Sequence, residues 1–153
     1  MNIIELKERN EISENIKAGQ ACNQLDELLT ELRKKQIPAN IAQSINEDIE
    51  ALNSATINDT DFGKLVKQKQ SKIIKLVEKE LKIVPQKYYT KLWLALGMSV
   101  FGIPLGVSFG ISIGNLGLLA IGLPIGMGIG ALAGSGMDKK AFEEGRQLAI
   151  EIK

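Results

Sequence analysis

The chain is poor in the side chains that metal and redox chemistry require. Its 153 residues include one cysteine, Cys22, and no histidine. One cysteine cannot close an intrachain disulfide, and zinc sites or Ser-His and Cys-His catalysis in their common forms are excluded. Cys22 falls in an apolar helical stripe, where a free thiol is usually buried. We therefore predict a non-enzymatic protein with no catalytic residue, no metal site and no cofactor.

Charge is absent from a long stretch near the carboxyl end, between Leu92 and Met137. A membrane-spanning helix needs about 20 apolar residues, so this stretch suits two spans, at about 92–113 and 116–135. Gly114-Asn115 supplies a tight turn between them. A soluble core helix of this length would show a polar face, which this stretch lacks. We predict a transmembrane helical hairpin over residues 85–137, against the alternatives of a glycine-rich soluble core or a disordered linker.

Glycine recurs at every fourth position of this apolar stretch, in two sets of four. The sets are Gly102, Gly106, Gly110 and Gly114, then Gly122, Gly126, Gly130 and Gly134. GxxxG spacing in an apolar helix lets two backbones approach closely, which favours helix packing in lipid. The neighbour that this spacing predicts is either the other span or a second subunit of a homo-oligomer.

The two spans contain a duplicated proline motif. GIPLG at 102–106 recurs as GLPIG at 122–126, twenty residues later. Proline removes a backbone hydrogen bond, so we expect kinks at Pro104 and Pro124. In an antiparallel hairpin both kinks would lie at nearly the same depth.

Flanking charges predict the orientation of the hairpin. Basic residues occur at both outer ends and not at the turn; they are Lys82, Lys87 and Lys91 before the first span and Lys139, Lys140 and Arg146 after the second. The positive-inside rule then predicts that both termini are cytoplasmic and that only the turn reaches the far side of the membrane. Tyr88, Tyr89 and Trp93 form the expected belt at the membrane interface. With no cleavable signal visible, the first span would serve as the insertion signal.

The rest of the chain is polar, and its charge is unevenly distributed. Residues 1–61 carry six basic and twelve acidic groups, and residues 62–91 carry nine lysines against Glu78 and Glu80. The tail, residues 138–153, is balanced and is expected to be cytoplasmic, with a short helix over 141–153. The acidic and basic parts should therefore prefer different partners.

Apolar periodicity in residues 1–84 predicts a cytoplasmic region of three amphipathic helices. They run from about Glu11 to Gln36, Ala39 to Asn53 and Phe62 to Val84. Asp59, Thr60 and Asp61 are each able to cap the third helix. The three helices could fold as a small bundle or pair across subunits as a coiled coil. The whole chain is therefore expected to be all-α.

The third predicted helix is basic on one face. Its lysines are Lys64, Lys67, Lys72, Lys75, Lys79 and Lys82. Its apolar face could pack on the other helices, with the lysines in water. Alternatively, the helix could lie on an anionic lipid surface. A third alternative is an acidic partner; nucleic acid is not expected, because aromatic side chains and recognised motifs are lacking.

The stretch from Lys91 to Lys153 resembles the membrane half of small uncharacterised two-pass bacterial membrane proteins with a glycine-zipper hairpin. The resemblance is carried by YYTKLW, FGIPLG, GLPIG and MDKKAFEEGRQL, and covers about 40% of the chain. It implies a bacterial inner-membrane protein and transfers no catalytic residue.

Two functions fit these patterns. The first is an integral membrane protein that self-associates through its glycine stripes and presents cytoplasmic helices to a protein partner. The second is an oligomeric pore- or lesion-forming, holin-like protein. Acidic and basic residues are missing from the spans, which argues against a coupled transporter.

Overall fold

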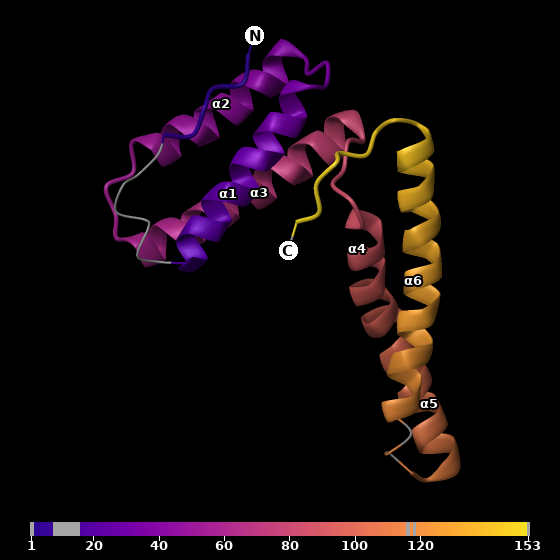
Figure 1. The fold of residues 1–153 in the computed structure, drawn as a ribbon. Helices are drawn as coiled ribbons and strands as arrows, with labels where there is room; N and C mark the ends of the chain where they lie inside the picture. Colours follow the sequence, from indigo (N-terminus) through magenta and orange to yellow (C-terminus); the bar gives the residue numbers. More distant parts are fainter. Residues whose placement is uncertain (1, 8–15, 116, 118, 153) are drawn as a thin grey trace. The chain divides into compact units, whose positions relative to one another are not determined.

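Apolar periodicity in the first half of the chain produces three helices, as predicted. They are α1 (Ile16–Arg33), α2 (Ala39–Asn53) and α3 (Asp59–Leu81), shown in Figure 1. The computed structural model describes residues 2–7, 16–115, 117 and 119–152, and no β-strand occurs among them. The chain divides into two units, Met1–Val84 with Leu148–Lys153 (unit 1) and Pro85–Gln147 (unit 2). The predicted all-α fold, three helices followed by a two-helix apolar hairpin, is confirmed.

The core of unit 1 is formed by the apolar stripes of its three helices. The side chains with least exposure are Leu25, Leu28, Leu29, Leu32, Ile45, Ile49, Leu52, Phe62, Val66, Ile73 and Val77. Burial of each large aliphatic side chain contributes roughly 1.5–3 kcal/mol of transfer free energy. Cys22 is half-buried rather than fully buried. Within the unit α3 packs against both α1 and α2, as expected for the predicted bundle.

The ends of α3 are fixed by a polar cap and a left-handed residue. Asn58 is the cap: its side-chain oxygen accepts the N–H of Asp61 at 2.9 Å. The predicted caps, Asp59, Thr60 and Asp61, are therefore wrong: the N-cap lies one to three residues before them. At the other end, Lys82 adopts φ 57°, and its N–H donates to the Glu78 carbonyl. The helix thus stops short of Val84.

A buried carboxylate joins α2 to α3. Asp48 is 3% exposed and accepts hydrogen bonds from Lys69 at 2.7 Å and Lys72 at 2.9 Å. Burial raises the pKa of the Asp48 carboxyl, but the two lysine hydrogen bonds and their charges outweigh it and hold the pKa below its ordinary value. Asp48 is thereby kept ionised in the fold.

Residues 2–7 are held in unit 1 by two asparagine side chains of α2. Asn46 accepts the N–H of Ile4 at 2.9 Å and donates to the carbonyl of Asn2 at 3.0 Å. Seven residues on, Asn53 accepts the N–H of Lys7 at 2.9 Å and donates to the carbonyl of Glu5 at 3.1 Å. Each amide therefore satisfies backbone groups of a segment that has no helix of its own.

The chain returns to unit 1 at its carboxyl end. Leu148 is 1% exposed, and its N–H donates to the Val84 carbonyl at 2.9 Å. The N–H of Ala149 donates to Glu31 of α1 at 3.0 Å, and Ile150 is buried. The helix expected over residues 141–153 is wrong. The preceding helix ends at Glu143, and described residues beyond it make tertiary contacts instead.

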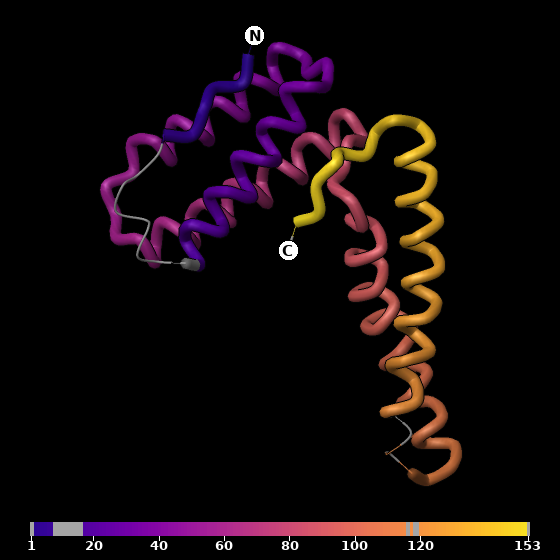
Figure 2. Tube along the Cα trace, viewed as in Figure 1, coloured from indigo at the N-terminus to yellow at the C-terminus, as the bar shows by residue number. Residues whose placement is uncertain are grey.

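Unit 2 is a hairpin of apolar helices. The first arm comprises α4 (Tyr88–Gly97), a π-helical turn η2 (Met98–Gly102) and α5 (Ile103–Ile113). The second arm is α6 (Leu119–Glu143), which runs back beside the first, as the trace in Figure 2 shows. The two arms pack against each other along their length. The predicted membrane hairpin, residues 85–137, falls within unit 2.

Candidate membrane hairpin

Both arms of unit 2 are long and apolar enough to cross a membrane. The candidate spans are Tyr88–Ile113, with 26 residues, and Ala120–Glu143, with 24 residues. At 1.5 Å rise per residue each exceeds the roughly 30 Å hydrocarbon thickness of a bilayer. The helices run past the predicted outer limits, Leu92 and Ser135, so charged residues occupy their outer turns.

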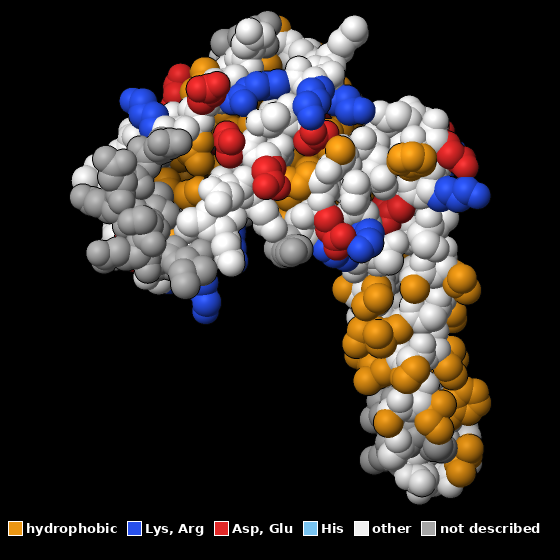
Figure 3. All heavy atoms as spheres, viewed as in Figure 1, with side chains coloured by type: hydrophobic (Ala, Val, Ile, Leu, Met, Phe, Trp, Pro, Cys, Tyr) orange, Lys and Arg blue, Asp and Glu red, His pale blue; other side chains and the backbone are white. Residues whose placement is uncertain are grey.

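Large apolar side chains cover the outside of the hairpin. Figure 3 shows them in orange along this part of the chain. They include Leu92, Leu96, Val100, Phe101, Ile103, Phe109, Ile111, Ile113, Ile121, Ile125, Ile129 and Leu132. Exposure reaches 70% at Ile111 and 77% at Leu132. A contiguous apolar surface of this kind marks a membrane or protein interaction site.

Glycine lies on the inside of the hairpin, where a soluble helix pair would place large side chains. A Cβ built on Gly126 would lie 2.4 Å from the Gly97 carbonyl oxygen, and one built on Gly122 would lie 2.3 Å from the Gly102 oxygen. At Gly130 and Gly134 the nearest backbone atoms would be 2.0 and 2.5 Å away. Real side chains do not tolerate such distances, so these positions require glycine.

The remaining predicted stripe positions divide into two groups. Gly106 and Gly110 are buried on α5, as Gly102 is at the end of η2. Gly114 is different: it ends α5 in the left-handed conformation, with φ 72°, and a Cβ there would meet nothing within 4 Å. Glycine is favoured at this position by the turn and not by packing.

Gly97 is a contact residue that the fourfold spacing did not identify. Gly102 comes five positions after Gly97, not four, and the π-helical turn η2 starts directly after Gly97 and ends at Gly102. Because a π-turn closes an i to i+5 hydrogen bond, five residues there make about one turn. The N–H of Ile103 donates to the Met98 carbonyl, as this pattern requires. The wider turn keeps Gly97 on the face that packs against α6.

The two prolines occupy different local settings. Pro104 lies in the first turn of α5, immediately after η2, where its missing N–H coincides with the irregular turn. Pro124 lies inside α6 and on its exposed side. The two prolines predicted to kink the spans thus lie next to a π-turn in one arm and within a continuous helix in the other.

Asp138 links the charged ends of the two arms. Its carboxylate accepts the N–H of Tyr89 at 3.0 Å and the N–H of Thr90 at 2.8 Å. These N–H groups open α4, whose preceding residue, Lys87, makes no side-chain cap hydrogen bond. The α6 aspartate therefore caps α4 from across the hairpin, where it also meets the positive end of the helix dipole. Sequence spacing gave no sign of this contact.

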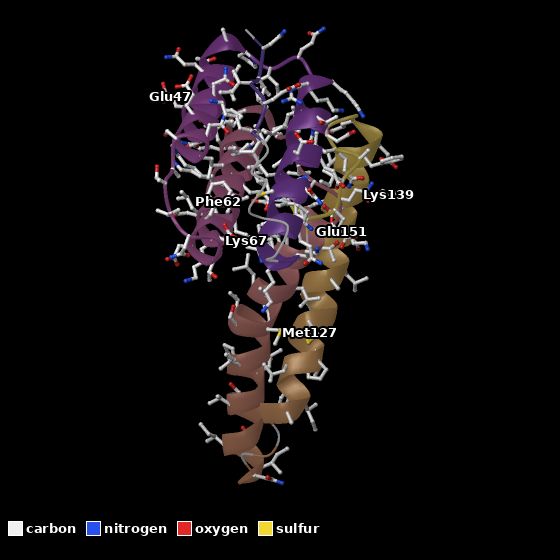
Figure 4. The ribbon with its side chains drawn as sticks, turned by 60° about the vertical axis from the view of Figure 1, so that its left-hand side comes forward. Glu47, Phe62, Lys67, Met127, Lys139 and Glu151 are labelled. Carbon is white, nitrogen blue, oxygen red and sulfur yellow. The ribbon has the colours of Figure 1, made fainter. Side chains whose placement is uncertain are left out.

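The three aromatic residues of the predicted interface belt lie at the same end of unit 2. Tyr88 and Tyr89 make an edge-to-face contact, with ring centroids 5.3 Å apart and ring planes at 76°. Tyr89 is buried, while Tyr88 and Trp93 are half-buried. Within the second arm, Met127 lies near the middle of α6 and Lys139 near its charged end (Figure 4). Charge and aromatic rings therefore occur together at the open end of the hairpin.

Five of the six predicted surface lysines lie on α3 in unit 1, and the sixth, Lys82, is the residue that follows this helix. Lys64, Lys67, Lys72, Lys75, Lys79 and Lys82 are exposed. The opposite face of α3 is buried in the bundle, including Phe62, Val66 and Ile73. Lys69, which the predicted set left out, is half-buried against Asp48.

Comparisons with known proteins add no assignment. No protein-family model, no curated protein and no solved structure matches the chain. Within the described residues, no group of three or more cysteine, aspartate or glutamate side chains could hold a metal ion.

Proposed function

We propose that the protein is an integral membrane protein whose hairpin anchors a helical domain to one face of a bilayer. The observation that supports this most strongly is the inverted arrangement of unit 2. Ile111 and Leu132 point outward, while Gly122 and Gly126 touch the opposite backbone. In water this arrangement would expose a large apolar surface. In lipid it costs nothing, and the close backbones gain dispersion contacts.

The connectivity of unit 1 supports one orientation. Unit 1 contains both Val84, which precedes the hairpin, and Leu148, which follows it, and these residues are hydrogen-bonded to each other. If unit 2 crosses a bilayer, both of its ends must then leave on the same side. The basic residues at both ends favour the cytoplasmic side, in a bacterial inner membrane. The bacterial setting itself comes only from the resemblance noted above.

The proposed role is a non-enzymatic one, in which unit 1 is presented to a protein partner. The glycine stripes support packing inside the hairpin, because their contacts are with the other arm. Self-association would then use outward residues of the spans. A holin-like pore is the alternative, and release of a trapped dye from vesicles containing the purified protein would favour it.

Membrane extraction and tag accessibility test the proposal. Membranes from expressing cells are washed with alkaline carbonate, and the protein should stay in the pellet. Epitope tags placed before Asn2 and after Ile152 should both be protected in sealed right-side-out vesicles and both be cleaved in inverted ones. Release by carbonate would contradict membrane insertion. Opposite accessibility of the two tags would contradict the hairpin topology.

A further inference from the structure

We propose that the lysine row of α3 binds the anionic phospholipid headgroups of the bilayer that holds the hairpin. The lysine row is defined as Lys64, Lys67, Lys72, Lys75, Lys79 and Lys82. The proposal rests on the proposed function, because it takes membrane insertion of unit 2 as given. It adds a second contact with lipid, made by the surface of unit 1.

The lysine row forms one face of the helix. At 100° per residue, the five lysines within α3 fall within an arc of about 140° around the helix axis, and Lys82 follows the last turn. Gln68 and Ser71 fall in the same arc and are also exposed. A flat, charged bilayer surface could therefore meet all six lysines at once.

The opposite face of α3 is already occupied. Phe62 is 1% exposed, and Val66 and Ile73 are fully buried in the bundle. An interfacial amphipathic helix would instead need this apolar face to enter the acyl region. Binding by α3 is therefore electrostatic: lysine side chains meet headgroups while the bundle stays folded.

Two lysines of the row, Lys67 and Lys75, make no ion pair with any described residue. Lys64 pairs with Asp61 at 2.9 Å, and Lys79 and Lys82 lie 3.8 and 4.0 Å from Glu80 and Glu78. The lysines of these three pairs are exposed to solvent, where an ion pair is weak and easily exchanged. Lys72 differs, because it is hydrogen-bonded to the buried Asp48. Five of the six lysines are therefore able to meet an anionic partner without breaking a buried pair.

The carboxylates of α1 and α2 contrast with the lysine row in charge. The sequence up to Asp61 has twice as many acidic as basic groups, and Asp26 and Glu27 of α1 and Glu47 and Glu50 of α2 are exposed. A negative leaflet attracts the lysine row and repels these carboxylates. Contact through the row is therefore favoured over contact through α1 or α2.

Chain continuity favours lipid over a soluble acidic partner. Six residues, 82–87, separate the end of α3 from the start of α4. They span at most about 20 Å, so the last turns of the lysine row stay close to the headgroups where α4 enters the membrane. A tethered contact of this kind has a high effective concentration, which a free acidic protein or nucleic acid lacks.

The test measures how close α3 comes to lipid in the full chain. In a Cys22→Ser background, a fluorophore is attached at Ser71→Cys, within the lysine row, or at Ala51→Cys, on the exposed side of α2 as the matched control. Each protein is reconstituted in vesicles with a headgroup-linked quencher, made either of phosphatidylcholine alone or with about 30 mol% phosphatidylglycerol. Circular dichroism checks that the labelled proteins keep their helix content.

Quenching at position 71 should be several-fold stronger in the anionic vesicles than in the neutral ones, while position 51 should not respond. Raising salt from about 0.1 M to 1 M should abolish the difference, because the Debye length falls to about 3 Å. The double substitution Lys67→Gln and Lys75→Gln should reduce the difference in quenching at position 71 between anionic and neutral vesicles. Neither lysine contacts the core, so folding should be retained.

Equal quenching at positions 71 and 51, or quenching at 71 that ignores lipid charge, would overturn the lysine proposal alone. The lysine proposal would also be overturned if added RNA or polyglutamate protected the label at position 71 from the quencher while phosphatidylglycerol had no effect on the quenching. That result would assign the lysine row to the added polyanion. Release of the protein from the vesicles by alkaline carbonate would instead remove the proposed function, and the lysine proposal with it.

Discussion

The Asp138 carboxylate of α6 accepts the main-chain N–H of Tyr89, 49 positions earlier in the chain, at 3.0 Å. A second bond to Thr90, at 2.8 Å, makes this carboxylate the cap of α4. It lies in the part of the hairpin where charge first appears, and it is 8% exposed. The contact fixes which residue of one arm stands opposite which residue of the other.

We predict that Asp138→Ala destabilises the hairpin by about 1–3 kcal/mol, since it leaves a buried and a part-buried N–H group without their acceptor. Unfolding in mild detergent, followed through the fluorescence of Trp93, would measure the loss. Glu143→Gln, at an exposed position further along α6, is the control and should change stability by less than about 0.5 kcal/mol. Equal stability of the Asp138 variant and the control would mean that the cap contributes nothing.

Two glycines of α6 offer a matched pair of substitutions. A Cβ on Gly126 would lie 2.4 Å from the Gly97 oxygen, whereas a Cβ on Gly128 would meet nothing within 4 Å. Gly126→Ala should separate the arms and cost about 1–3 kcal/mol through overpacking. Gly128→Ala should be neutral or stabilise the helix by up to about 1 kcal/mol.

Thermal unfolding in mild detergent, again monitored at Trp93, distinguishes the two glycine variants. Their particle masses would also show whether the stripe joins subunits. A change of mass in Gly126→Ala with an unchanged unfolding midpoint would indicate a subunit contact rather than a contact within the hairpin.

The stability of unit 1 should depend on pH through Asp48. Because the pKa of this carboxyl is lower in the fold than its ordinary value of 3.8, its stabilising contribution is fully present above that value. The contribution should be lost as pH falls through the lower, folded-state pKa. Urea unfolding followed by circular dichroism at several pH values below about 5 would measure the slope.

Asp48→Asn is the variant that isolates this effect. It should lose about 1–3 kcal/mol near neutral pH, because it weakens the hydrogen bonds from Lys69 and Lys72. The free energy of unfolding of this variant should also fall less steeply with decreasing pH than that of the wild type. Glu47→Gln, on the exposed side of α2, is the control. Parallel pH profiles for the wild type and Asp48→Asn would show that another carboxyl is responsible.

The carboxyl-terminal segment should be needed for the stability of unit 1. Leu148→Ala removes a side chain that is 1% exposed and should cost about 2–5 kcal/mol. Hydrogen exchange of the α1 and α3 amides should accelerate accordingly. Phe142→Ala, at a position that is 70% exposed, is the control. Unchanged exchange after Leu148→Ala would show that the segment is only loosely attached.

Local pattern was enough to predict the helices. The period of Leu25, Leu28, Leu29 and Leu32 identifies the buried side of α1, and the α2 limits, Ala39 and Asn53, were predicted to the residue. The absence of charge identified the two long apolar helices. These features depend on neighbours in sequence, where hydrophobic periodicity and helix breakers operate.

Contacts between distant residues had no such signal. Nothing in the spacing pairs Asp138 with Tyr89, or Glu31 with Ala149, since one carboxylate among many has no periodicity. Gly97 was missed because the π-turn breaks the fourfold repeat that revealed the other glycines. The helix expected after residue 141 failed because tertiary hydrogen bonds to Val84 and Glu31 outweigh the helix propensity of a short segment.

Residues 148–152 belong to unit 1, and the rest of that unit, up to Val84, is synthesised before the hairpin. A ribosome must therefore synthesise both apolar helices before unit 1 receives Leu148 and Ile150. Until then unit 1 lacks these two buried side chains, so its core is completed only after the hairpin has been synthesised.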